Sequence, residues 1–449
     1  MPKREQKRRW PKRFLIILLV AIGIRFALMN LNHPLDLQTW QGLYVDLGNN
    51  RSPYDTLENL TADARATLGA GWSGTDAYMY YTYPPMLMMI HYPFAKLYAL
   101  FYPPVPLNFS PVGVDPYPQV PLLLNFLFKL PIFLADIGIA LLLYKMTKRS
   151  EKTVVAFLFN PLVILVSACW MFDSIAAFFL LLATYLFERK RYDLSAVSLA
   201  FGFLTKIFPI FALPIFCTEF IRQRSWKFVR YAFIFGLVSA LVIAPFWSGV
   251  KLSFEYQAAR EPSGLTPLNF TVVLQEAGVS QSTLDELKFA ILPVIGTFLL
   301  VMGMSAIYAY LSKKEMSLRR KILITLVVYF MVSKNVHEPH ILTLIPFFLL
   351  ELHESSTLDK RIHYHVIWIL PFIYAAVGVP LIRFLYGYID PNVLRLFESQ
   401  ALPSGIVLAQ GIVLGAVVIM FYAALSSLLI TLIRGKPPVP IEALKRLRK

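Results

Sequence analysis

The sequence predicts an all-α protein that crosses a membrane many times. Of its 449 residues, 57% are hydrophobic and only 16% are charged, and the mean hydropathy is +0.58. A soluble domain carries about 25% charged residues and cannot bury this much apolar surface. The apolar residues gather in long runs, and helices satisfy their own backbone inside a bilayer. A single integral membrane domain over 1–449 is therefore expected.

Long apolar runs predict about 12 membrane-spanning helices. Several are shorter than the roughly 20 residues that a full crossing needs, which favours broken or half-depth helices around a buried cavity. The segment 86–102 contains His91, Pro93 and Lys96, so we interpret it as an amphipathic helix at the interface. The predicted spans lie near 14–32, 121–144, 153–170, 174–188, 193–205, 208–221, 229–248, 289–311, 321–334, 340–352, 365–385 and 406–433.

Positive charge is concentrated in short segments that alternate with these spans and hold 31 of the 43 Lys and Arg residues. This is the distribution of the positive-inside rule, and it places both termini in the cytoplasm. The net charge of +16 therefore reflects topology, and nucleic-acid binding is not expected. The predicted cytoplasmic segments are 1–13, 145–152, 189–191, 222–230, 313–321, 360–361 and 434–449.

Two long segments, 33–120 and 249–288, fall on the outer side. The first is rich in Tyr and Pro, as in YMYYTYPPM and FYPPVPL, and not in the residues typical of disordered chain. We expect it to form a folded cap with amphipathic helices, whose aromatic rings lie at the level of the lipid headgroups.

Asp36 directly follows the first span, in NHPLDLQTW, where the membrane is expected to meet water. An Asp here can cap the next helix or act as a catalytic carboxylate. The order of first helix, acidic residue, RSPY and YPP resembles the GT-C superfamily, multi-span glycosyltransferases that use polyprenyl-phosphate sugars. The stretch 33–54 is most similar to the mannosyltransferases that add the first mannose of GPI anchors. Asp36 matches the second acid of their D-x-D motif and Pro34 replaces the first, which leaves one carboxylate as the general base.

Two further outer-side segments resemble the same superfamily. FNPLVILVSACWMFDSI is similar to its third and fourth spans and carries Asp173, a second edge carboxylate or else a helix cap. SKNVHEPHILTLIPF resembles the VHEK-type segment of the dolichyl-phosphate-glucose glucosyltransferases. His337 and Glu338 match that motif, Pro339 replaces its basic residue, and Lys334 lies just upstream.

Four basic residues lie within or at the edge of predicted spans: Arg25, Lys129, Lys206 and Arg383. A charge at the centre of a span costs at least about 2.5–3.5 kcal/mol and marks a functional candidate. Lys206 and Arg383 map near the outer side, where a lipid phosphate would lie, although snorkelling to the interface is the alternative. Lys129 and Asp136 are seven residues apart and share a helical face, so they could pair through a neighbour.

The resemblance implies a hexosyltransferase that works at the extracytoplasmic face. It would move a sugar, mannose by preference or glucose, from a polyprenyl or dolichyl phosphate to a glycan or glycolipid hydroxyl. Asp36 would be the general base of an inverting reaction, with Asp173 as a second catalytic carboxylate. The residues expected to bind the donor phosphate are Lys206, Lys334, His337 and Arg383. The expected substrate contacts are His33, Gln38, Tyr83 and Glu338.

A transporter or flippase of a lipid-linked sugar is the main alternative, because it would share the spans and the buried cations. It would not need an acidic residue at the base of a large outer loop. The test of the two classes is whether sugar is transferred.

The sequence identifies no cofactor, and a divalent metal, Mn²⁺ or Mg²⁺, is compatible with this function. The spacing of His337, Glu338 and His340 is not H-E-x-x-H, so no zinc site is expected there. Cys169 and Cys217 lie in apolar runs, which excludes a disulfide framework and a cysteine-based zinc site.

The expected partners are the lipid-phosphate sugar, its acceptor, membrane lipids and a small accessory membrane subunit. The plasma membrane of an archaeon or bacterium is the preferred location, and the endoplasmic reticulum is the second.

Overall fold

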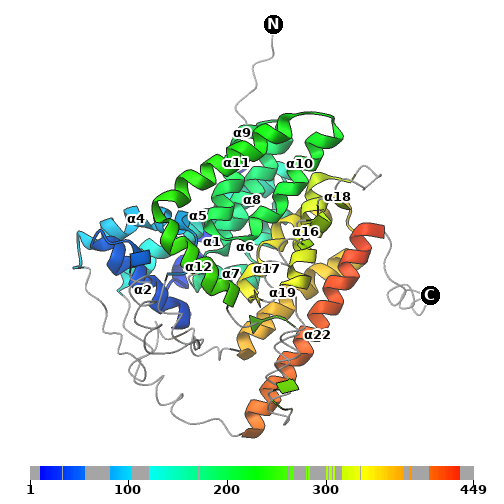
Figure 1. The fold of residues 1–449 in the computed structure, drawn as a ribbon. Helices are drawn as coiled ribbons and strands as arrows, with labels where there is room; N and C mark the ends of the chain where they lie inside the picture. The colour runs from blue at the N-terminus through cyan, green and yellow to red at the C-terminus, as the bar shows by residue number, and fades with distance from the viewer. Residues whose placement is uncertain are drawn as a thin grey trace.

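The computed structural model consists mainly of α-helices over the residues that it describes (Figure 1). These are 11–32, 34–55, 81–103, 121–169, 171–259, 263–266, 316–333, 335–378 and 404–434, with scattered positions between 280 and 308 and at 385. In chain order the helices are α1 (Lys12–Ala27), α2 (Pro34–Gly48), α4 (Pro85–Ala99), α5 (Leu122–Met146), α6 (Glu151–Leu158), α7 (Pro161–Ala168), α8 (Asp173–Glu188), α9 (Tyr192–Thr205), α10 (Leu213–Arg222), α11 (Lys227–Ile243), α12 (Trp247–Ala259), α16 (Leu318–Val332), α17 (Glu338–Ile341), α18 (Leu344–Glu354), α19 (Leu358–Gly378) and α22 (Ser404–Arg434). The 3-10 helices η2 and η3 span Phe208–Ala212 and Ala244–Phe246, and the strands β1 and β2 span Ser263–Gly264 and Asn335–Val336.

Three helical segments among the described residues are long and apolar enough to cross a membrane. They are Leu122–Met146 in α5, Lys227–Glu255 through α11, η3 and α12, and Ala409–Ile433 in α22. Other apolar helices are shorter, as α8 and α9 have 16 and 14 residues. Helix length therefore supports three crossings, or four with one bent pair, and the expected total of about 12 stays a prediction.

The bent pair is α6 and α7, which meet at an angle of 51° inside the predicted span 153–170. The break has a local cause. Pro161 has no backbone N–H to continue the helix, and the side chain of Asn160 accepts hydrogen bonds from the N–H groups of Leu162 and Val163. A second difference concerns the span 229–248, because helix continues through η3 and α12 to Ala259, into the segment expected as an outer loop.

An apolar outer surface suits contact with lipid. On α11 the side chains of Phe233 and Leu241 are each 65% exposed, and Ile412 and Ile419 of α22 are 57% and 58% exposed. Large apolar side chains exposed along whole helices are unusual in soluble proteins and fit a hydrocarbon environment. The chain is accordingly an integral membrane protein. Figure 1 shows α22 beside α19 on one side of the molecule, with α2 and α4 together on the other.

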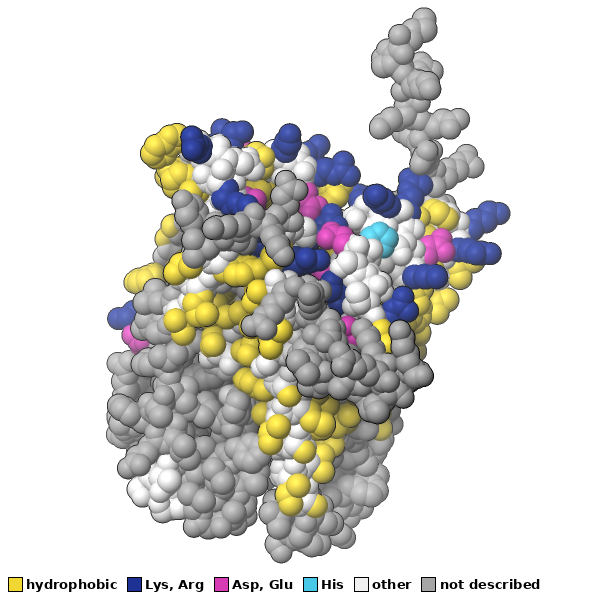
Figure 2. Space-filling model, turned by 90° about the vertical axis from the view of Figure 1, so that its right-hand side faces the viewer, with side chains coloured by type: hydrophobic (Ala, Val, Ile, Leu, Met, Phe, Trp, Pro, Cys, Tyr) yellow, Lys and Arg dark blue, Asp and Glu magenta, His cyan; other side chains and the backbone are white. Residues whose placement is uncertain are grey.

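Basic segments from distant parts of the sequence meet at one end of the molecule, called here the basic end. Figure 2 shows Lys and Arg side chains gathered along this end, with hydrophobic side chains among the coloured residues below it. Ion pairs with acidic residues connect the segments. These pairs are Arg319 with Glu188 and Glu354, Arg320 with Glu351, Lys321 with Glu219, and Lys360 with Glu351. Residues 189–191, 319–321 and 360–361, which belong to segments predicted to share the cytoplasmic side, therefore lie in or next to these pairs.

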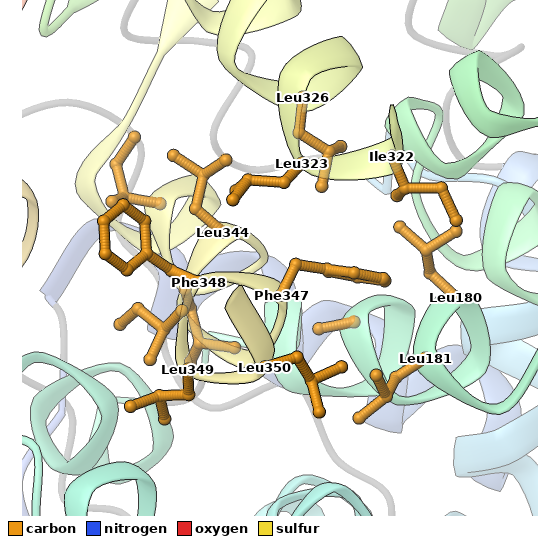
Figure 3. Packing of buried hydrophobic residues seen from close by; sticks show 14 of the residues in the cluster. Leu180, Leu181, Ile322, Leu323, Leu326, Leu344, Phe347, Phe348, Leu349 and Leu350 are labelled. Carbon is orange, nitrogen blue, oxygen red and sulfur yellow. The ribbon is translucent and has the colours of Figure 1, made fainter. Parts of the chain in front are cut away.

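The hydrophobic core lies between α8, α16 and α18 (Figure 3). Leu180 and Leu181 of α8 and Phe347 and Leu350 of α18 are completely buried. Burying a side chain of this kind stabilises the fold by about 1.5–3 kcal/mol relative to exposure to water. This packing holds the three helices in one orientation, with the start of α8 at the end of the molecule opposite the basic end.

Candidate functional site

The candidate site lies at the outer end, which is opposite the basic end. α8 runs from Asp173 to Glu188, and Glu188 pairs with Arg319 at the basic end. Its 16 residues span about 24 Å at 1.5 Å per residue, which is most of the roughly 30 Å thickness of the hydrocarbon core of a bilayer. α9 returns in the opposite direction and ends at Thr205, directly before Lys206. Asp173 and Lys206 therefore meet at this end.

Asp173 and Lys206 form an ion pair, with Oδ1 of Asp173 2.6 Å from Nζ of Lys206. The Asp173 side chain is 2% exposed and that of Lys206 is 16% exposed. Asp173 opens α8, where the helix dipole favours a negative charge, but it does not cap the helix, since Phe172 holds the cap position. The Lys206 ammonium also lies 4.9 Å from the centre of the Phe172 ring. Burying two charges costs desolvation free energy. A buried pair at the end of the molecule is therefore a candidate for function.

Three aromatic rings connect this pair to α2. Trp40 lies 5.2 Å from Phe172 in an edge-to-face contact, and Tyr83 lies 4.8 Å from Phe172 in the same geometry. Trp40 and Tyr83 are stacked on each other, 5.7 Å apart. Asp36 occupies the first turn of α2, four residues before Trp40. The start of α2 is thereby packed beside the start of α8, although the side chain of Asp36 is outside the described residues.

Lys129 holds the segment that leads into α2. It is completely buried in α5 and donates hydrogen bonds to the carbonyl oxygens of Met29 and Leu31 and to Oδ1 of Asn32. These carbonyl groups lie just beyond the end of α1, where the helix dipole places partial negative charge. Lys129 thus positions the chain immediately before Asp36.

The aromatic part of the first outer segment is tied to α12. The hydroxyl of Tyr54 donates to the carbonyl oxygen of Tyr83, and the hydroxyl of Tyr81 donates to that of Pro84. Nε2 of Gln257 donates to Oγ1 of Thr82 at 3.3 Å. The described part of the segment is therefore folded against the helices.

Burial lowers the pKa of His91 to about 3, so its ring is neutral. His91 stacks on Phe128 and lies 6.0 Å from Trp40. Nδ1 of His91, Nε1 of Trp40 and the hydroxyl of Tyr44 are buried without a hydrogen-bond partner among the described residues. Buried polar atoms normally have partners, so these three atoms are an exception among the described residues.

The motif that contains His337 is attached to the second outer segment by a short pair of strands. β2 pairs in parallel with β1, and the N–H of Leu265 donates to the carbonyl oxygen of Val336 at 2.6 Å. Gly264 has a φ of +84°, and a β-carbon there would lie 2.2 Å from the oxygen of Val336. Only glycine fits this close approach. The hydroxyl of Tyr374 donates to the carbonyl oxygen of Gly264 at 3.1 Å, which fixes the pairing from α19.

His337 caps α17 together with His340. Nδ1 of His340 accepts the backbone N–H of His337 at 3.3 Å, and Glu338 opens the short helix. The ring of His340 lies 6.3 Å from Phe208, two residues after Lys206. The motif therefore adjoins η2, on the side of Lys206.

The structure brings several predicted site residues to one end. Asp173, Lys206 and Tyr83 lie around Phe172, and the motif of His337 and Glu338 reaches η2 through the ring of His340. Asp36 and Gln38 belong to α2, but their side chains are outside the described residues. His33, Lys334 and Arg383 lie outside the described residues altogether.

Sequence reasoning missed the roles of Trp40 and Phe172. The signal was available for both, because Trp40 is one helical turn after Asp36 and Phe172 directly precedes Asp173. It also left Lys129 and Asp136 as a pair, whereas Asp136 binds Arg25 at 2.7 Å and Lys129 binds the end of α1.

No group of three or more His, Cys, Asp or Glu side chains close enough to hold a metal ion occurs in the described part of the chain. Asp36 and His33 are not included in that statement, since their side chains are not described.

No protein-family model and no curated protein matches this chain. Among solved structures it is similar to ArnT from Cupriavidus metallidurans, whose crystal structure is bound to undecaprenyl phosphate. The TM-score is 0.44 and the sequence identity 15%, over 92% of this chain and 77% of the other. At this level of similarity, the assignment of a function rests on the residues themselves.

Proposed function

We propose that the protein is a GT-C type glycosyltransferase that moves a sugar from a polyprenyl phosphate to an acceptor hydroxyl at the outer end. The observation that carries the proposal is the meeting of Asp173, Lys206 and the start of α2 at the end opposite the basic end. These segments come from separate motifs that resemble the GT-C superfamily. A transferase of this kind needs a carboxylate and a cation together at the edge of the membrane.

Asp36 acts as the general base. It takes the proton of the acceptor hydroxyl while that oxygen attacks the anomeric carbon, and the polyprenyl phosphate leaves from the opposite face. Direct displacement inverts the configuration of that carbon. The position of Asp36 in the first turn of α2, next to Trp40, supports this role.

Lys206 stabilises the negative charge of the leaving phosphate. A cation contributes most to such stabilisation in a site that excludes water, and the Lys206 side chain is only 16% exposed. In the structure its charge is balanced by Asp173 at 2.6 Å. A donor phosphate competes with Asp173 for Lys206, and Lys334, His337 and Arg383 complete the phosphate contacts.

The sugar and the acceptor contact His33, Gln38, Tyr83 and Glu338. Mannose is the preferred sugar and glucose the second, and the acceptor is a glycan or glycolipid. The ring of Tyr83 is partly exposed at this end, and it is held by stacking on the buried ring of Trp40, 5.7 Å away. The protein works in the plasma membrane of an archaeon or bacterium, together with a small accessory subunit.

The first experiment is sugar transfer by the purified full chain from radiolabelled dolichyl-phosphate mannose or dolichyl-phosphate glucose to a crude lipid and glycan extract. We expect transfer by the unmodified protein and a loss of about 10²–10⁴-fold in Asp36→Asn, because the general base is gone. Binding of the donor, measured separately, should persist in the variant.

Asp55→Asn is the matched control, because Asp55 is an exposed acid in the same outer segment. It should keep full activity. Activity that survives in Asp36→Asn would remove Asp36 as the base and make Asp173 the next candidate. Donor binding without transfer by the unmodified protein would favour a transporter of the lipid-linked sugar.

A further inference from the structure

A pocket of about 260 Å³ opens at the basic end, between the α8–α9 turn and the start of α11. Four basic side chains line it, those of Lys190, Arg191, Lys227 and Arg230. The acidic side chain in the lining is Asp193, which pairs with Arg230 at 2.6 Å. That pair is largely exposed, at 71% and 50%, and adds little stability by itself. The lining keeps an excess of three positive charges.

The backbone adds to this positive potential. α9 begins at Tyr192 and α11 begins at Lys227, and both residues line the pocket. The first N–H groups of a helix have no partner within the helix, and the dipole makes this end attractive to anions. The ammonium of Lys227 lies 5.4 Å from the centre of the Tyr192 ring, so the two helix starts are in contact across the pocket.

α11 also carries exposed apolar side chains, and Phe233 lies one helical turn after Arg230 of the pocket. Val229, Phe233, Leu237 and Leu241 recur at every fourth position and are 49%, 65%, 45% and 65% exposed. Trp226, just before α11, is 80% exposed, and tryptophan is enriched where membranes meet water. A basic pocket at the interface with an apolar stripe below it matches the two parts of a phospholipid.

We propose that this pocket binds the phosphate headgroup of an anionic phospholipid, whose acyl chains lie along the exposed stripe of α11. The site is independent of the proposed transferase chemistry, since it lies at the other end of α8 and α9. A bound lipid would join the α8–α9 turn to α11 and stabilise the arrangement of α8, α9 and α11.

The test measures the binding of phosphatidylglycerol and of phosphatidylcholine to the delipidated full chain by native mass spectrometry. We expect preferential binding of phosphatidylglycerol and about 25-fold weaker binding in Arg191→Gln/Lys227→Gln, because each basic side chain near an anionic surface contributes a factor of about five. Both side chains lie at the surface of the pocket, so their replacement should leave the fold intact.

Lys145→Gln/Lys152→Gln is the matched control, because it removes the same charge from exposed positions that belong to another segment of the basic end. It should bind phosphatidylglycerol like the unmodified protein. An equal loss in the control, or equal binding of phosphatidylcholine, would overturn the proposal. Inorganic phosphate should compete only weakly, and competition as strong as that of the lipid would assign the pocket to a soluble phosphate compound instead.

Discussion

Arg25 and Asp136 form an ion pair that is completely buried between α1 and α5. Asp136 also accepts hydrogen bonds from the hydroxyl groups of Ser167 and Ser174, each at 2.6 Å. Arg25 donates in addition to the carbonyl oxygens of Ala21 and Leu158. The pair thus joins five helices, α1, α5, α6, α7 and α8, and it is completely enclosed, so we assign it to stability rather than to catalysis.

Removing one partner of this pair should be strongly destabilising. Arg25→Leu leaves the carboxylate of Asp136 buried without a cation, which costs about 3–5 kcal/mol. We expect a clear drop in the midpoint of thermal unfolding of the detergent-purified protein. Asp136→Asn alone should have a similar effect, because it leaves the guanidinium of Arg25 unpaired.

The double variant Arg25→Leu/Asp136→Asn is the informative control for the ion pair. With both charges removed, at least half of the lost stability should return. If the effects of the two single substitutions simply add, the charges do not interact and the pair is not the cause of the stability.

At the scale of elements, the pairing of β1 with β2 attaches the second outer segment to the motif that contains His337. The two strands are separated by about 70 residues in the sequence and consist of two residues each. Such short strands are not stable by themselves. Their pairing therefore depends on the close approach at Gly264 and on the hydrogen bond from Tyr374.

Gly264→Ala should open this pairing. Alanine disfavours a φ of +84°, by about 1–2 kcal/mol, and its β-carbon would meet the oxygen of Val336. We expect faster hydrogen–deuterium exchange in peptides that contain Leu265 and 335–340. If the motif shapes the donor site, the rate of sugar transfer should fall as well.

Gly236→Ala provides the comparison, because a β-carbon at Gly236 meets nothing within 4 Å on α11. Its exchange and activity should match the unmodified protein. Unchanged exchange in Gly264→Ala would mean that the paired strands do not depend on this glycine.

At the scale of the whole molecule, the clustered basic residues and the candidate catalytic residues lie at opposite ends. The ion pairs of Arg319, Arg320 and Lys360 lie at one end, and Asp173 with Lys206 lies at the other. From the positive-inside rule we expect the basic end to face the cytoplasm and the candidate site to face outward.

Cysteine labelling tests this orientation. In a Cys169→Ala/Cys217→Ala background, Ser280→Cys should react with a membrane-impermeant maleimide on intact cells, whereas Lys190→Cys should react only after permeabilisation. Both positions are exposed in the structure, so access is governed by the membrane. The reverse pattern would place Asp36 and Asp173 in the cytoplasm and contradict the proposed function.

Much of the secondary structure was predictable because it follows from local patterns. The expected spans 121–144, 174–188 and 193–205 correspond closely to α5, α8 and α9, since each is a predominantly apolar run. The sequence predicted that some spans would be broken helices, but it did not predict that the break would fall between α6 and α7. Helix length did not decide the number of membrane crossings, because many of the described helices are shorter than the 18 residues taken as the minimum for a crossing.

The sequence by itself determined that the chain is helical, lies in a membrane and separates its basic segments from its acidic edge residues. These properties depend on composition and on neighbours within one or two helical turns. Only the tertiary structure decided which charges meet. Lys206 binds Asp173 across 33 positions and Arg25 binds Asp136 across 111. The physical reason is that a buried charge has to find its partner wherever packing brings one, and packing depends on contacts between helices that no local pattern encodes.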